Sequence, residues 1–310
     1  MQLPELLDSL IEAGQQQLGS GDNRRMVGDV LARLPLQAPE DWRQLAAALA
    51  VSSADEVRVL GISGGQGAGK STLASLLVVA AQALGRRAIS VSLDDFYLTR
   101  AERQQLGREV HPLLATRGVP GTHDVALACR TLKALLEPGE CQVPVFDKSV
   151  DDRADLGRTV SGPFDLVVFE GWCVGALAEP AARLAEPINE LERKEDPEGR
   201  WRSHVNGALE NEYPALWGIL QSLLFLMVPD MAAVIRWRTE QEQAHPAERR
   251  MTAEAIGRFV AHYERLTRWM SESMPARADL LALLDDEHRL AELVAGGAAH
   301  RQPGQPSRST

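Results

Sequence analysis

The chain has 310 residues, of which 45% are hydrophobic, enough to form the core of one large domain or two small ones. A formal net charge of −10 argues against nucleic acid or an anionic membrane as the main partner, because both require a basic surface. The three cysteines are widely spaced, which argues against a disulfide framework or a zinc site. No signal-peptide pattern opens the chain, and no apolar run is long enough to span a bilayer, so we expect a cytoplasmic protein.

Residues 1–55 precede the first predicted strand and are predicted to form an N-terminal helical extension. Apolar side chains recur there at helical spacing in two stripes, Leu3, Leu6, Leu7, Leu10 and Ile11, then Trp42, Leu45 and Leu49. These stripes favour packing onto the main domain, and a partner-binding surface is the alternative.

Apolar runs alternate with helical stretches from residue 57 onward. The predicted strands are 57–63, 88–93, 164–169, 223–228 and 279–284. Their hydrophobicity is continuous rather than alternating, which is typical of strands buried on both faces of a parallel sheet. The pattern predicts a three-layer, doubly wound α/β fold.

The main domain is predicted to span residues 56–295, with a helical insertion at about 174–222. Within the insertion, the charged stretch 191–200 contains a turn signal and is predicted to be a solvated bend. Residues 296–310 are predicted to form a disordered tail.

Residues 64–71, GGQGAGKS, match the phosphate-binding pattern G-x-x-x-x-G-K-[ST]. A predicted strand precedes them and a helix rich in Ala and Leu follows, which is the setting that this loop requires. The predicted ATP-binding residues are Gly64, Gly65, Gln66, Gly67, Ala68, Gly69, Lys70, Ser71 and Thr72. In such a loop the lysine reaches the β- and γ-phosphates, and the serine hydroxyl is a ligand of Mg²⁺.

Two aspartates, Asp94 and Asp95, directly follow the second predicted strand, with Tyr97 close behind. Ligands of open α/β sheets gather at the carboxyl ends of the strands. An acid there can accept the proton of a hydroxyl that attacks the γ-phosphate, or help to hold Mg²⁺. Helix capping by the two aspartates is the alternative.

Glu170 ends the apolar run 164–169 and precedes Gly171. A carboxylate at the tip of such a strand can polarise a water molecule bound to Mg²⁺. A solvent-facing acid is the alternative.

Two polar clusters are candidate contacts for a small anionic substrate. The loop 117–124, RGVPGTHD, supplies Arg117, His123 and Asp124, and Asp124 could equally cap the following helix. Lys148 and Arg153 belong to a second cluster at 146–153, which could bind a carboxylate or the transferring phosphate. A solvated surface cluster is the alternative for the second group.

Arg236 and Arg238 lie on a predicted helix after the strand 223–228. Arginines on a mobile lid can neutralise developing charge and exclude water. Because residues two apart do not share a helix face, at most one of the pair is expected to point inward.

Four motifs together resemble the plant and fungal type of D-glycerate 3-kinase: LDDFYLT (93–99), RGVPGTHD (117–124), VFDKS (145–149) and FEGWCVG (169–175). The segments 201–213 and 235–242 are also similar, and the resemblance covers about residues 57–290. The layout is more distantly similar to uridine kinase, pantothenate kinase and phosphoribulokinase. The first 55 residues lie outside the resemblance.

The resemblance implies a phosphate-loop (P-loop) kinase with a five-stranded parallel sheet. It also implies ATP and Mg²⁺ as cofactors and D-glycerate as the small-molecule substrate, phosphorylated at its primary hydroxyl. The catalytic base of the relatives falls on Asp94, and Lys70 is the other predicted catalytic residue. Glycerate and the transferring phosphoryl group would then contact Asp95, Tyr97, Arg117, His123, Asp124, Lys148 and Arg153.

Two alternatives remain open from the sequence. The first is a kinase for a nucleoside, pantothenate or a sugar phosphate, which would use the same loop and acid with a different acceptor pocket. The second is a catalytically silent ATP-binding regulatory protein. The joint presence of Lys70, Ser71, Asp94 and Glu170 favours an active kinase over the silent protein.

Overall fold

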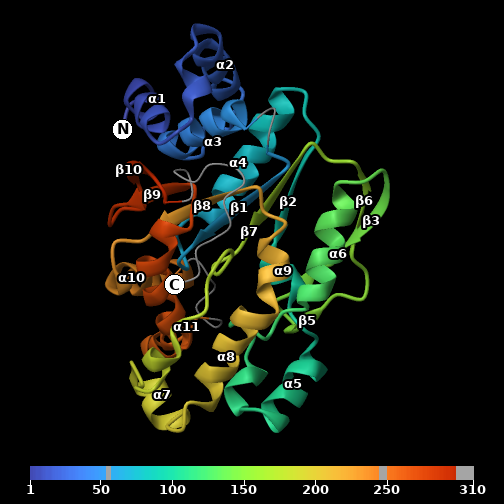
Figure 1. Ribbon diagram of the computed structural model, residues 1–310, viewed down its shortest axis with the longest axis vertical. Helices are drawn as coiled ribbons and strands as arrows, with labels where there is room; N and C mark the ends of the chain where they lie inside the picture. The colour runs from blue at the N-terminus through green and yellow to red at the C-terminus, as the bar shows by residue number, and fades with distance from the viewer. Residues whose placement is uncertain (54–56, 244–249, 298–310) are drawn as a thin grey trace.

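A computed structural model describes residues 1–53, 57–243 and 250–297 (Figure 1). Its centre is a six-stranded sheet with the order β10-β9-β8-β1-β7-β2. The strands are β1 Val59–Gly64, β2 Ala88–Ser92, β7 Leu166–Glu170, β8 Ser222–Met227, β9 Leu280–Leu284 and β10 Leu290–Ala295. β1, β2, β7, β8 and β9 run parallel, which confirms the predicted strands and the doubly wound fold.

β10 was not predicted, and it pairs antiparallel with β9 at the edge of the sheet. Glu292 interrupts its apolar residues, and only Leu290 and Leu293 are buried, so no long continuous apolar run marks it. The predicted tail begins at Gly296, whose N–H still donates to the carbonyl of Asp279. Residues 298–310 lie outside the described residues.

Two apolar cores, one on each face of the sheet, explain the continuous hydrophobicity of the strands. Val168 belongs to one core, while its neighbours Val167 and Phe169 belong to the other. The first core contains α1 Leu3–Glu12, α2 Gly21–Leu31, α3 Glu40–Ser52, α4 Lys70–Ala83 and the apolar face of α10 Met231–Gln243. The second contains α6 Val125–Leu135, α8 Arg200–Asn211, α9 Tyr213–Trp217 and α11 Ala253–Ser273.

The N-terminal helices pack against the sheet domain, since α1 and α3 share the first core with α4 and the strands (Figure 1). Trp42 of α3 is buried, and the neighbouring Asp41 accepts a hydrogen bond from the backbone N–H of Leu290 at 2.7 Å. The division at residues 55 and 56 into an extension and a kinase domain stays a prediction.

Shorter elements lie at the right of the molecule in Figure 1 and in its lower half. They include α5 Arg100–Glu109, α7 Glu190–Glu195, the hairpin of β3 Gly139–Val143 with β6 Arg158–Gly162, and the small hairpin of β4 Phe146–Asp147 with β5 Asp152–Arg153. A 3₁₀ turn, η2, spans Leu93–Phe96 directly after β2.

The predicted solvated bend at 191–200 is wrong for two of its acids. Glu192 and Asp196 are buried, and each accepts hydrogen bonds from an arginine, Arg265 at 2.7 Å and Arg202 at 3.0 Å. Buried carboxylates need such partners because burial removes their hydration. The two buried acids therefore join α7 to α8 and α11, while Arg193, Lys194, Glu195 and Glu198 of the same segment are exposed.

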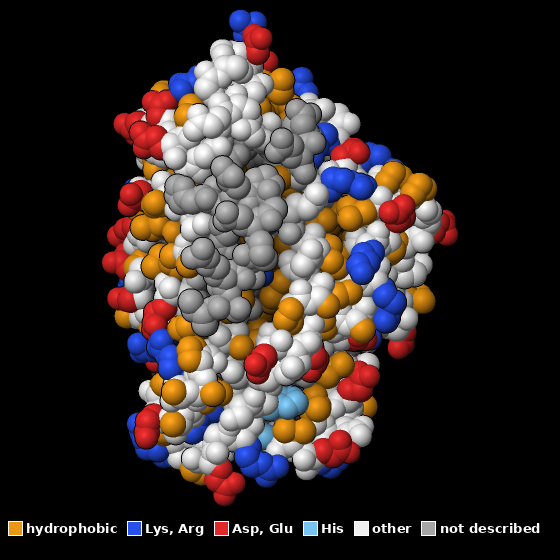
Figure 2. Space-filling view, in the orientation of Figure 1, with side chains coloured by type: hydrophobic (Ala, Val, Ile, Leu, Met, Phe, Trp, Pro, Cys, Tyr) orange, Lys and Arg blue, Asp and Glu red, His pale blue; other side chains and the backbone are white. Residues whose placement is uncertain are grey.

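Acidic and basic side chains are interspersed over the face shown in Figure 2, and the basic ones there do not gather into one broad surface. No helix within the described residues is both long and apolar enough to cross a membrane. The expectations that nucleic acid and membranes are not partners stay predictions.

Candidate active site

The predicted chemistry gathers in a cavity of about 250 Å³ at the carboxyl ends of β1, β2 and β7. Its lining includes the phosphate loop and residues from five other segments: Gln66, Gly67, Lys70, Ser71, Ser92, Asp94, Tyr97, Lys148, Glu170, Gly171, Trp172, Arg238, Gln241, Phe259 and Tyr263. This is the edge at which ligands bind in open α/β sheets.

The phosphate loop follows β1 and leads directly into α4, which begins at Lys70. Gly67 and Gly69 have φ angles of +83° and +85°, a region that favours glycine. A side chain at Gly67 would also come within 2.9 Å of the Cβ atom of Trp237. Backbone N–H groups in such a loop and the positive end of α4 together suit a bound phosphate.

The ammonium group of Lys70 lies inside this loop and donates a hydrogen bond to the carbonyl oxygen of Gly65 at 2.8 Å. Burial lowers the pKa of Lys70, and the nearby carboxylates of Glu170 and Asp94 oppose that effect. The desolvated charge is therefore placed where the phosphates of a nucleotide would compensate it.

Ser71 and Glu170 lie within hydrogen-bonding distance, with the serine hydroxyl donating to Oε1 of the glutamate at 3.1 Å. Glu170 is the last residue of β7 and is almost fully buried. A hydroxyl beside a buried carboxylate suits a hard cation, so Ser71 and Glu170 are the residues that would hold Mg²⁺. The described residues contain no cluster of three or more acidic, histidine or cysteine ligands, and this arrangement does not require one.

Of the two adjacent aspartates, Asp94 is the one that lines the cavity. Its carboxylate pairs with Lys148 at 2.7 Å and accepts a hydrogen bond from the Tyr97 hydroxyl at 2.8 Å. Burial alone would raise the pKa of Asp94, but Lys148 and the Tyr97 hydroxyl outweigh burial and lower it below its usual value. Asp94 is therefore ionised and ready to accept a proton at neutral pH.

Asp95 has a different role in the fold, since its Oδ1 accepts the backbone N–H of Phe146 at 3.2 Å. It is absent from the cavity lining, and burial raises its pKa. Adjacent in sequence, the two aspartates point to different partners, and Asp95 holds the β4–β5 hairpin that carries Lys148.

Three predicted substrate contacts are absent from the described cavity lining, and each pairs with a protein group. Arg117 forms an ion pair with Asp151, and Arg153 donates to the carbonyl of Tyr97 at 2.9 Å. Asp124 caps α6 by accepting the N–H of Leu127 at 2.9 Å, which is the capping alternative. Direct contact of Arg117, Asp124 and Arg153 with a substrate therefore stays a prediction.

His123 is buried, and its ring stacks on that of Tyr97 with 4.6 Å between the centroids. Burial lowers the pKa of His123 to about 4, so the ring is neutral at physiological pH.

The relatives of this chain among known proteins include kinases. An uncharacterized kinase of Schizosaccharomyces pombe is 36% identical over 220 residues, which cover 66% of this chain and 78% of the relative. The chloroplastic D-glycerate 3-kinase of Arabidopsis thaliana is 33% identical over 222 residues, which cover 66% of this chain and 46% of the relative. The chain therefore matches less than half of the plant protein. No protein-family model matches the chain.

The structure of D-glycerate 3-kinase from Cryptococcus neoformans superposes with a TM-score of 0.64 at 26% identity, covering 89% of this chain and all of that one. The chain belongs to the D-glycerate 3-kinase family of P-loop kinases. It is a phosphotransferase that acts on the alcohol group of a small molecule.

The two predicted lid arginines of this family member point in different directions. Arg238 of α10 lines the cavity, and its guanidinium lies over the ring of Phe259 at 4.8 Å while pairing with Glu242. Arg236 pairs instead with the exposed Asp286. Two residues apart on α10, they occupy different faces, as helical geometry requires.

Sequence reasoning about this kinase missed several aromatic residues of the site. Trp172 donates its indole N–H to the carbonyl of Gly118 at 2.9 Å, and Tyr263 donates its hydroxyl to the carbonyl of Arg117 at 3.2 Å. Trp172 lies within the recognised FEGWCVG motif, so a signal for it was present. Tyr263 and Phe259 lie on α11, where their spacing resembles that of ordinary core residues.

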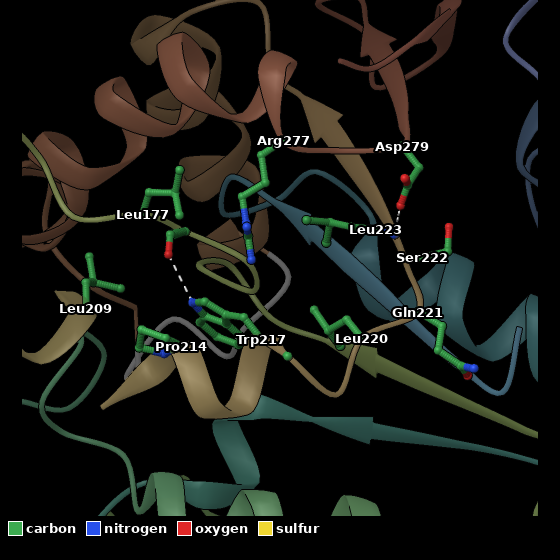
Figure 3. Close-up of a pocket in the computed structure, with 12 residues that line it drawn as sticks. Leu177, Leu209, Pro214, Trp217, Leu220, Gln221, Ser222, Leu223, Arg277 and Asp279 are labelled. Atoms are coloured by element: carbon green, nitrogen blue, oxygen red, sulfur yellow. Dashed lines mark hydrogen bonds between the residues drawn. The ribbon is translucent and has the colours of Figure 1, made fainter. Parts of the chain in front are cut away.

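A larger cavity of about 470 Å³ opens at the opposite end of the sheet, where β8 and β9 begin (Figure 3). Leu177, Trp217, Leu223, Arg277 and Asp279 are among its lining residues. We place the active site in the smaller cavity, because the phosphate loop and the carboxyl ends of the parallel strands meet there and not at the larger one.

Proposed function

We propose that this kinase uses ATP and Mg²⁺ to phosphorylate the primary hydroxyl of D-glycerate. The observation that carries the proposal is the Asp94–Lys148 pair, which shares one cavity with Lys70, Ser71 and Glu170. Phosphoryl transfer to a small anionic alcohol requires a base, a cation and a phosphate loop, and Asp94, the exposed Lys148 and the loop at 64–71 can supply them. The names of the Arabidopsis and Cryptococcus relatives support glycerate as that alcohol.

In the proposed reaction, the phosphate loop and Lys70 would hold the triphosphate, and Ser71 with Glu170 would hold Mg²⁺, which when bound would supply positive charge to the phosphate oxygens. Asp94 accepts the proton of the attacking hydroxyl. Lys148, largely exposed on its hairpin, can then turn from Asp94 to the substrate carboxylate or the transferring phosphoryl group.

Arg238 completes the proposed site from the lid side, where its charge can stabilise the transferring phosphoryl group. The loop 117–124 would surround the remainder of the acceptor. Because positioning and charge stabilisation supply most of the catalysis in phosphoryl transfer, these residues need no covalent chemistry. We extend the proposal to a cytoplasmic location.

An acceptor panel tests the substrate. Purified protein would be incubated with ATP, Mg²⁺ and D-glycerate, L-glycerate, uridine, pantothenate or a sugar phosphate, and ADP release and product mass would be measured. Phosphorylation of D-glycerate at the primary hydroxyl is the expected result. Product from uridine or pantothenate and none from D-glycerate would overturn the glycerate assignment, while tight ATP binding without turnover on any acceptor would favour a silent regulatory protein.

A further inference from the structure

The buried ring of His123 has one nitrogen without a partner among the described residues. Its Nε2 atom is shielded from solvent and makes no hydrogen bond there. An unsatisfied buried polar atom costs on the order of 1–3 kcal/mol, so native structures seldom leave one without a reason.

The other ring nitrogen, Nδ1, lies 2.6 Å from the hydroxyl oxygen of Tyr213, at the start of α9. That oxygen also accepts a hydrogen bond from the backbone N–H of Gly121 at 3.2 Å. A backbone N–H can only donate, and among the described residues no acceptor other than Nδ1 is placed to take the hydroxyl hydrogen of Tyr213. The arrangement that satisfies this hydrogen has Nδ1 as the unprotonated nitrogen.

Both partners keep this arrangement at neutral pH. Burial raises the pKa of the Tyr213 hydroxyl well above its usual value, so the hydroxyl retains its hydrogen. The His123 ring, with a pKa of about 4, is neutral and carries one proton. With Nδ1 occupied as an acceptor, that proton lies on Nε2, which becomes a buried donor without an acceptor.

The ring of His123 contacts a residue that is hydrogen-bonded to the proposed catalytic base. His123 stacks on Tyr97, and the hydroxyl of Tyr97 donates to Asp94. The backbones of Tyr97 and His123 also form an isolated antiparallel bridge, so the two rings keep their relative positions. A continuous chain of contacts thus runs from Gly121 through Tyr213, His123 and Tyr97 to Asp94.

We propose that Tyr213 is a positioning residue that keeps His123 in the tautomer whose Nε2–H donates a hydrogen bond to an oxygen atom of the acceptor molecule. The identity of that molecule rests on the proposed function, but the tautomer does not. An uncharged N–H at this place suits a hydroxyl or carboxylate oxygen, and it leaves Asp94 ionised beside it.

The tautomer can be read without activity from the ¹⁵N resonances of the histidine rings, with His123 assigned by its absence in His123→Gln. Wild-type protein should show a protonated Nε2 and an unprotonated Nδ1 for this ring. In Tyr213→Phe the Nδ1-protonated form should become populated. A protonated Nδ1 in the wild type would overturn the proposal, whichever acceptor the enzyme uses.

A double-mutant cycle tests the link to the acceptor. With the acceptor that the panel identifies, Tyr213→Phe should raise the acceptor KM about tenfold and leave the ATP KM unchanged, as expected for one misplaced hydrogen bond. Glutamine at 123 keeps an N–H near the Nε2 position but has no Nδ1, so Tyr213→Phe should cost less than about twofold in the His123→Gln background.

If Tyr213→Phe raised the acceptor KM equally in the wild-type and His123→Gln backgrounds, its effect would not pass through His123. Its hydrogen bond with Gly121 would then explain the effect, and the proposal would fail. Melting temperatures of all four proteins control for loss of fold. If D-glycerate gives no product while another acceptor does, the substrate assignment fails, and the same cycle on that other acceptor still decides the role of Tyr213.

Discussion

Lys148 and Asp94 are 54 residues apart in sequence, yet the lysine Nζ atom lies 2.7 Å from a carboxylate oxygen of the aspartate. Lys148 comes from the tip of the β4–β5 hairpin, and Asp94 from the 3₁₀ turn after β2. The pair keeps the proposed base ionised before substrate arrives, and it places a cation where a carboxylate or phosphate can bind.

Replacing Lys148 with Met should change the pH dependence of the reaction. Lys148 is the main group that lowers the pKa of Asp94 against the opposing effect of burial. Without it the pKa of Asp94 rises, so a higher pH is needed to ionise the base. The acid limb of the kcat/KM profile for the acceptor should therefore move to higher pH, and an unmoved limb would show that the pair does not set the base.

The adjacent aspartates form a matched pair of variants. Asp94→Asn should lower kcat by about 10²–10⁴-fold, the range for loss of a general base, with ATP affinity nearly unchanged. Asp95→Asn keeps an acceptor oxygen for the N–H of Phe146 and should retain most of the rate. Steady-state kinetics and ATP titration check both; a normal rate in Asp94→Asn would remove Asp94 as the base.

Lys70→Ala should damage catalysis far more than folding. The ammonium group has only the Gly65 carbonyl as its hydrogen-bond partner among the described residues, and its charge is desolvated. We expect kcat/KM to fall by about 10²-fold or more, as when an electrostatic donor to the transition state is lost. The melting temperature without ATP should stay close to that of the wild type, and a large decrease would contradict this.

Gly67→Ala and Gly85→Ala separate backbone strain from steric conflict. Both glycines have positive φ, +83° and +78°, but a Cβ atom meets Trp237 only at Gly67 and nothing within 4 Å at Gly85. Each variant should lose about 1–2 kcal/mol of folding free energy from strain. Gly67→Ala should in addition raise the ATP KM, because Trp237 or the loop must move, whereas equal ATP KM values would argue against a tightly packed loop.

The two predicted lid arginines, Arg236 and Arg238, form a further matched pair of variants. Arg238→Ala should lower kcat, since this side chain lines the cavity, and Arg236→Ala should change it little, since its partner Asp286 lies on the surface. Single-turnover rates with saturating ATP and acceptor measure the difference. Equal losses would place both arginines, or neither, at the transferring phosphate.

Local patterns were enough for the framework of this kinase. The strands were predictable because each is buried on both faces, so its hydrophobicity is uninterrupted, as Val167 and Val168 show by facing opposite cores. β10 was not predicted because Glu292 interrupts its apolar residues and only Leu290 and Leu293 of this edge strand are buried. The charged stretch 191–200 was predicted to be solvated, but Glu192 and Asp196 are buried because arginines on other helices pair with them.

The phosphate loop and the acids at the ends of β2 and β7 were predictable from local sequence, since the proposed function of the loop resides in consecutive backbone groups and one lysine. Three features required the folded structure: which of two adjacent aspartates faces the cavity, the contact of Lys148 with Asp94, and the pairing of Arg117 with Asp151. Those outcomes depend on contacts between distant segments, whose directions follow from packing and burial and leave no local periodicity to read.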